Sequence, residues 1–217
     1  MRRIDFGFFV RPDAETGTGA PRAEPCLGYL IEHPDGLLLV DTGMGADDWV
    51  DGHYQPRRIP LPEALGVPLD DIRYVVNCHL HFDHCGGNPQ LAGRPVFTQR
   101  AELAAARTMA DYTLPELIDA PGITYTELDG EAEILPGVLI VPTPGHTAGH
   151  QSVVVRRRDG TVIVAGQSHD NATAYSADVL AHRAGVKEIQ TPPWIERLAQ
   201  LDPARVVFAH DNAVWTP

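Results

Sequence analysis

Short apolar segments separated by glycine and proline recur along this chain. Tyr29–Glu32 and Leu37–Val40 flank the sequence His33–Gly36, an arrangement that is typical of a β-hairpin. Gln151–Val155 and Thr161–Ala165 likewise flank an Asp-Gly turn. The two patterns predict two pairs of antiparallel strands.

Further strands and two helices are expected between and after these hairpins. The other apolar segments expected to form strands are Arg73–Cys78, Val96–Thr98, Glu133–Leu135, Val138–Val141 and Arg205–Ala209. Alanine- and leucine-rich composition favours helices at Arg100–Asp111 and Pro193–Leu201. Strands open the chain, helices intervene and strands return, which predicts sheet layers flanked by helices and not a doubly wound parallel sheet.

The size and charge of the chain exclude several classes of protein. Its 217 residues suit a single domain, which we expect to span residues 1–217. With 17 Lys and Arg against 29 Asp and Glu, the formal net charge is −12, which argues against binding of nucleic acid. The 43% of hydrophobic and 21% of charged residues argue against a disordered chain.

Membrane and export patterns are absent from the sequence. No apolar stretch approaches the roughly 20 residues of a spanning helix, and the residues after Met1 lack the pattern of a signal peptide. The three cysteines, Cys26, Cys78 and Cys85, indicate reduced thiols. We expect Cys78 and Cys85 to be small buried residues and the protein to be cytoplasmic, monomeric or homodimeric, without a membrane partner.

The histidines carry the candidate chemistry. In His79–Leu80–His81–Phe82–Asp83–His84, four potential metal ligands occur within six residues, directly after a predicted strand. His79 and His81 point to the same side of an extended segment, because strand side chains alternate. Imidazole and carboxylate groups suit zinc and similar divalent ions, so this cluster predicts a metal site.

Two more histidines follow predicted strands. His146 and His210 lie in loops after strands, where binding residues are commonly found, and both are candidate ligands. His150 stands at the start of a strand and is expected to support its loop. Asp41 follows the strand Leu37–Val40, and we expect its carboxylate to brace the metal loop.

Three segments, HLHFDHCGGN, TPGHTAGHQS and AHD, resemble the metallo-β-lactamase superfamily, and within it the N-acyl-homoserine lactone lactonases. Tyr29–Gly36, Asp41–Met44 and Gln99–Glu102 are similar to the same branch, so the resemblance extends from about Leu27 to Asp211. It implies an α/β (α+β) fold, a four-layer αββα sandwich with a two-metal site at one edge of its sheets. Zn²⁺ is the expected metal, with one or two ions per chain. The implied ligands are His79, His81 and His146 for one metal, and Asp83, His84 and His210 for the other.

Gln167 departs from the family pattern. The lactonases carry an aspartate here that bridges the two metals, and a neutral glutamine carbonyl is a much weaker ligand. Without the bridging anion, repulsion between the two cations is less well compensated. Either Gln167 leaves a weakened second metal site, or Asp170 or His169 replaces the bridge. Asp170 stands where the lactonases carry a tyrosine that assists the substrate carbonyl.

The resemblance and the ligands together predict a hydrolase. We expect a metal-bound hydroxide to open a lactone or similar ester of a small acyl substrate. Asp83 is expected to carry a proton as well as to ligate, and Asp170 to assist the leaving alkoxide. The alternatives are a thioesterase or amidase of the same fold, or a metal-binding homologue without activity. Gly45–Pro60, which contains Trp49, His53 and Tyr54, is expected near the mouth of the pocket.

Overall fold

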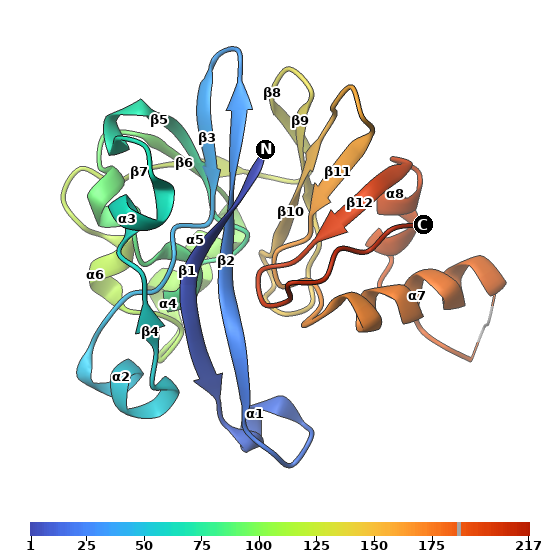
Figure 1. Cartoon of the computed structure of the whole chain (residues 1–217), viewed down its shortest axis with the longest axis horizontal. Coiled ribbons are helices and arrows are strands. Elements are labelled where there is room, and N and C mark those ends of the chain that lie inside the picture. Colours follow the sequence, from blue (N-terminus) through green and yellow to red (C-terminus); the bar gives the residue numbers. More distant parts are fainter. Residues whose placement is uncertain (186–187) are drawn as a thin grey trace.

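The computed structural model describes residues 1–185 and 188–217. Within these ranges the chain forms a seven-stranded and a five-stranded sheet that pack face to face, with helices on the outer side of each (Figure 1). The strand orders are β4-β1-β2-β3-β5-β6-β7 and β12-β11-β10-β9-β8. The predicted four-layer αββα sandwich is confirmed.

The strands of the larger sheet are β1 (Arg2–Arg11), β2 (Arg22–His33), β3 (Gly36–Val40), β4 (Arg57–Arg58), β5 (Ile72–Val76), β6 (Pro95–Gln99) and β7 (Thr124–Leu128). Those of the smaller sheet are β8 (Ala132–Leu135), β9 (Val138–Pro142), β10 (Gln151–Val155), β11 (Thr161–Val164) and β12 (Pro203–Val207). The predicted hairpins therefore form as β2–β3 and β10–β11.

Eight α-helices and two 3-10 helices are described: α1 (Asp13–Thr16), α2 (Asp48–Tyr54), α3 (Leu61–Leu65), η1 (Leu69–Asp71), α4 (Phe82–Cys85), η2 (Asn88–Leu91), α5 (Arg100–Thr108), α6 (Pro115–Ile118), α7 (Ala172–Ala184) and α8 (Trp194–Ala199). Among the described residues, no helix combines the length and apolar character needed to cross a bilayer.

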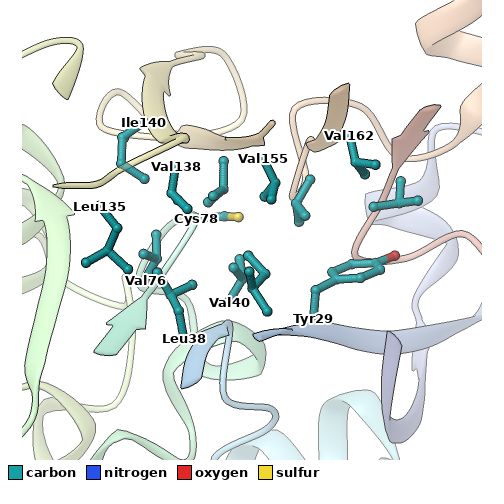
Figure 2. Close-up of a cluster of buried hydrophobic side chains, with 14 residues drawn as sticks. Tyr29, Leu38, Val40, Val76, Cys78, Leu135, Val138, Ile140, Val155 and Val162 are labelled. Atoms are coloured by element: carbon teal, nitrogen blue, oxygen red, sulfur yellow. The ribbon is translucent and has the colours of Figure 1, made fainter. Parts of the chain in front are cut away.

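The central core lies between the two sheets. Figure 2 shows Leu38 and Val40 of β3 on one side of this cluster and Val138 and Val155 on the other. Leu39, between the two β3 residues, packs in a separate cluster on the outer face of its sheet. Both faces of such strands are buried, which accounts for their uninterrupted apolar runs.

Several predicted boundaries were wrong, and two long elements were not predicted. Strand β5 ends at Val76, because the Cys78 N–H leaves the sheet and donates to the Asp41 carboxylate at 2.8 Å. Helix α5 ends at Thr108, and Asp111 adopts a left-handed φ of 57° that a continuing helix does not allow. The unpredicted elements are β1 and α7.

Strand direction brings the candidate residues together. β3 and β5 run parallel, as do β11 and β12. β9 and β11 share a direction because each is antiparallel to β10. The carboxyl ends of these strands therefore lie together at one edge of each sheet, and the loops that follow them carry the predicted ligands.

Candidate metal centre

Two groups of metal-donor side chains form where these loops meet. Within each group, the donor atoms lie within 4.8 Å of one another. The first group contains His79, His81 and His146, and the second contains Asp83, His84 and His210. Sequence positions up to 127 residues apart thus converge in the two trios that the family resemblance implies.

His79 shows that the first group suits a metal. Its side chain is fully buried, and neither ring nitrogen has a hydrogen-bond partner among the described residues. Buried polar atoms normally have partners, so an imidazole without any is poised to donate a lone pair to an ion. The His146 Nε2 and His81 Nδ1 atoms, 3.2 Å apart, complete the group.

The three imidazoles of this group are neutral at neutral pH. Burial lowers the pKa of His79 well below its usual value, and the neighbouring histidines lower it further. Burial also lowers the pKa of His81, although Asp83 opposes the shift. Although His146 is partly exposed, desolvation of its ring and the nearby His81 lower its pKa to about 3. Neutral imidazoles are the form that binds metal.

The second group is more polar. The His210 Nε2 atom lies 3.2 Å from His84 Nε2 and 3.3 Å from the Asp83 carboxylate. Burial alone opposes ionisation of Asp83, but His84 and His210 outweigh it and hold the pKa of Asp83 far below its usual range. Burial likewise opposes a charged His84, but Asp41 and Asp83 outweigh it and raise its pKa to about 9. The two carboxylates thus stabilise positive charge at this group, which is a proton on His84 without metal and would be a metal ion once that proton is displaced.

Asp41 braces the second group, as predicted. Its Oδ2 atom lies 2.9 Å from His84 Nδ1, so the opposite ring nitrogen is directed at the donor group. Its Oδ1 atom accepts the backbone N–H of Cys78. Asp41 thereby connects strand β3 to the start of the loop that carries His79 and His84. Its φ of 58° lies in the left-handed region, which Asp and Asn tolerate better than most residues.

Replacing Asp41 by Asn is expected to weaken metal binding at the second group by about 10–100-fold, because loss of such a supporting carboxylate has an effect of this size. Asn keeps the shape and the left-handed backbone, so the fold should persist. Competition with a chelator measures the affinity. An unchanged affinity in a normally folded variant would contradict the bracing role of the carboxylate.

Gln167 lies in the loop after β11, beside the second group. Its Oε1 atom is 3.2 Å from His210 Nε2, and its side chain borders the same cavity as His81 and Asp83. Its backbone N–H donates to His150 Nε2 at 3.0 Å. His150 also contacts Thr143, so the prediction that it supports the loop is confirmed.

Asp170 pairs with two arginines and is not a member of either donor group. Its carboxylate lies 3.0 Å from Arg11 and 3.4 Å from Arg22. Burial opposes the shift, but Arg11 outweighs it and lowers the pKa of Asp170. The other candidate, His169, contacts the Asp178 carboxylate at 3.0 Å. Asp170 is therefore a hydrogen-bond acceptor at neutral pH, and neither residue joins the metal-donor groups.

Arg11 and Glu24 were not identified from the sequence. Glu24 is buried on β2, and its carboxylate lies 3.0 Å from the Arg11 guanidinium and accepts from Arg22 Nε at 2.7 Å. Arg11 also borders the cavity, with Asp170 on its other side. The sequence analysis also did not single out Glu102, which accepts the Leu80 N–H, or Tyr112, whose ring packs against His81.

Replacing Arg11 by Met is expected to lower the free energy of unfolding by about 2 kcal/mol, because the buried Glu24 charge loses one of its two cations. The matched control is Arg197→Met, since Arg197 pairs with Glu131 at the surface and its loss should cost less than about 1 kcal/mol. Urea unfolding of both variants measures the difference. Equal destabilisation would contradict a structural role for the buried pair.

The cavity beside the donor groups has a volume of about 1110 Å³. Phe9, Trp49, Tyr54 and Phe82 supply an aromatic part of its wall. The prediction that Gly45–Pro60 lies near the pocket is confirmed for Trp49 and Tyr54. His53 does not border the cavity but stacks on Trp49, with 4.8 Å between ring centroids.

Cys78 and Cys85 are both fully buried, as predicted.

An αββα sandwich with histidine and aspartate donors on loops at one edge of its sheets defines the metallo-β-lactamase class of fold. The family model described as Metallo-beta-lactamase superfamily matches residues 21–210, and the chain belongs to this superfamily.

Among characterised relatives, an N-acyl homoserine lactonase from a Bacillus species is 36% identical over 157 residues. That match covers 64% of this chain and 62% of the relative, so it spans less than two thirds of either protein. The N-acyl homoserine lactonase AttM of Rhizobium johnstonii is 28% identical over 92% of this chain and 87% of its own length.

Solved structures agree with these sequence relationships. An N-acyl homoserine lactone hydrolase with bound N-hexanoyl-L-homoserine superposes with a TM-score of 0.78 at 26% identity, covering 97% of this chain and 92% of that one. The dizinc lactonase AidC, at 16% identity and a TM-score of 0.70, shares the fold. The chain is thus a superfamily member related to lactonases, with a candidate metal centre.

Proposed function

We propose that this protein is a metal-dependent hydrolase that opens a lactone or a similar ester. The observation that carries the proposal is the convergence of two metal-donor groups beside one large cavity. The proposed ligands are His79, His81 and His146 for one ion, and Asp83, His84, His210 and the weaker Gln167 for the other. Zn²⁺ is the proposed ion because it is commonly held by imidazole and carboxylate ligands.

A bound divalent ion would supply two effects, a coordinated water with a pKa near about 7 and polarisation of the substrate carbonyl. The protein's own side chains would supply groups that handle protons and bind the leaving hydroxyl. Asp83 borders the cavity, where its carboxylate would relay a proton between water and the leaving oxygen; its lowered pKa means that it would hold that proton only transiently. Asp170 is also ionised and borders the cavity, so it would accept a hydrogen bond from the leaving hydroxyl group and would not protonate it.

The proposed substrate class rests on the relatives and on the cavity wall. The relatives compared above are named N-acyl homoserine lactonases, and one bound molecule is N-hexanoyl-L-homoserine. In this chain, apolar lining residues come from α2 and from residues 106–118. An uncharged acyl group fits such a wall by burying apolar surface.

Turnover of the metal-analysed protein tests the proposal. The purified enzyme would be incubated with simple lactones, thioesters and β-lactams after elemental analysis of its metal content. We expect lactone hydrolysis that a chelator abolishes and Zn²⁺ restores. Hydrolysis of thioesters or β-lactams alone would favour the alternative activities, bound metal without turnover would favour a non-catalytic homologue, and the absence of metal would overturn the proposal.

We further propose that residues 1–217 form one domain, because strands of both sheets share the central apolar cluster. A cytoplasmic location is supported by the three free cysteines, all buried.

A further inference from the structure

Glu102 is a fully buried carboxylate beneath the metal-binding loops. It lies in the first turn of α5 and accepts three hydrogen bonds from separate parts of the chain. Its Oε1 atom accepts the Leu80 N–H at 2.8 Å and the Tyr112 hydroxyl. Its Oε2 atom accepts the Thr147 hydroxyl at 2.7 Å.

Each of these donors adjoins a residue of the first metal-donor group. Leu80 lies between His79 and His81, and Thr147 directly follows His146. The Tyr112 ring contacts the His81 ring, with 4.8 Å between centroids, and it also borders the cavity. A single side chain therefore connects the loop after β5, the loop after β9 and one wall of the cavity.

The backbone around Glu102 is packed to permit these contacts. A Cβ atom on Gly149 would lie 2.3 Å from the Glu102 backbone nitrogen, so only glycine allows the loop after β9 to approach so closely. No ligand role explains the burial of Glu102, since the described donor groups do not include it. Buried carboxylates are retained when they are fully hydrogen-bonded, and this one is bonded to both loops.

We propose that Glu102 is a positioning residue that holds His79, His81 and His146 in the arrangement needed to bind one metal ion. Through Tyr112 it also fixes the adjacent cavity wall. This inference rests on the proposed metal site. The carboxylate suits the task because both of its oxygens are acceptors, whereas a glutamine side chain presents NH₂ at one position and leaves at least one of the three donors without an acceptor.

Titration with Co²⁺, followed by visible absorption, tests the proposal on the purified metal-free protein. We expect Glu102→Gln to weaken binding at the first group by about 10–100-fold, the range found for residues that orient ligands. The second group should keep its affinity. Thr147→Val removes one of the three hydrogen bonds and is less disruptive. It should weaken Co²⁺ binding at the first group by a smaller factor.

Leu198→Ala is the matched control for general destabilisation. Leu198 is fully buried among residues on the outer face of the five-stranded sheet, away from the donor groups. The Leu198→Ala variant should have a lower melting temperature, and its Co²⁺ affinity at the first and at the second group should be unchanged. Wild-type affinity in both Glu102→Gln and Thr147→Val would overturn the positioning role alone. Failure of the wild-type protein to bind Co²⁺ would overturn the proposed metal site, and this inference with it.

Discussion

His81→Ala is expected to remove most bound metal and hydrolytic activity together. His81 contributes one of three neutral imidazoles in the first group, and no other described Cys, His, Asp or Glu joins that group to replace it. Because loss of a residue that merely orients a ligand costs about 10–100-fold, loss of the ligand itself should reduce kcat/KM by more than about 100-fold. Elemental analysis and lactone turnover on the same preparation measure both effects.

His33→Ala is the control for this experiment. His33 lies at the β2–β3 turn, at the opposite end of β3 from Asp41, and bonds to the Pro136 carbonyl. Its replacement should leave metal content and turnover unchanged. If His81→Ala retains metal and activity in a folded protein, the assignment of the first group is wrong.

The two donor groups were predictable because most of their members lie close together in the sequence. His79, His81, Asp83 and His84 fall within one short segment, so their proximity requires only the end of one strand. The distant histidines His146 and His210 became candidates because each follows a predicted strand, and the family resemblance then assigned them to the two trios. The brace by Asp41 followed from its place after a predicted strand.

Arg11 could not be placed in the same way. On β1, Ile4 and Phe6 are buried at even positions, whereas Phe9 and Arg11 are buried at odd positions. The change coincides with an irregularity in pairing with β2 between Asp5 and Phe8. An extra residue in a strand turns every later side chain to the other face. The burial of Arg11 therefore depends on a bulge that alternation alone does not predict.

Glu102 and α7 were missed for different physical reasons. In the sequence, Glu102 is an acidic residue in a predicted helix, with no pattern that marks it as special. Its proposed role depends on contacts with two loops that are distant in the sequence. Helix α7 buries only Tyr175, Val179 and Ala181, so its sequence lacks a strong apolar stripe. In both cases tertiary contacts, not local sequence pattern, determine the role of the segment.

Gln167→Asp is expected to raise the metal content toward two ions per chain. Two divalent ions about 4 Å apart repel each other by on the order of 10 kcal/mol even at an effective dielectric constant of about 20. Gln167 borders the cavity beside His210 but offers only a neutral carbonyl. A carboxylate at this position would offset part of the repulsion, so the second ion should resist a chelator longer and activity at limiting metal should rise.

Gln167→Asn is the matched control, because it shortens the side chain equally without adding charge. The competing hypothesis is that Asp170 already replaces the bridge, in which case Asp170→Asn would lose metal while Gln167→Asp would gain none. The geometry favours the first outcome, since the Asp170 carboxylate is paired with Arg11 and Arg22 and is not a member of either donor group. If a folded Gln167→Asp variant has the same metal stoichiometry and chelator resistance as Gln167→Asn, a missing anionic bridge does not limit binding of the second ion.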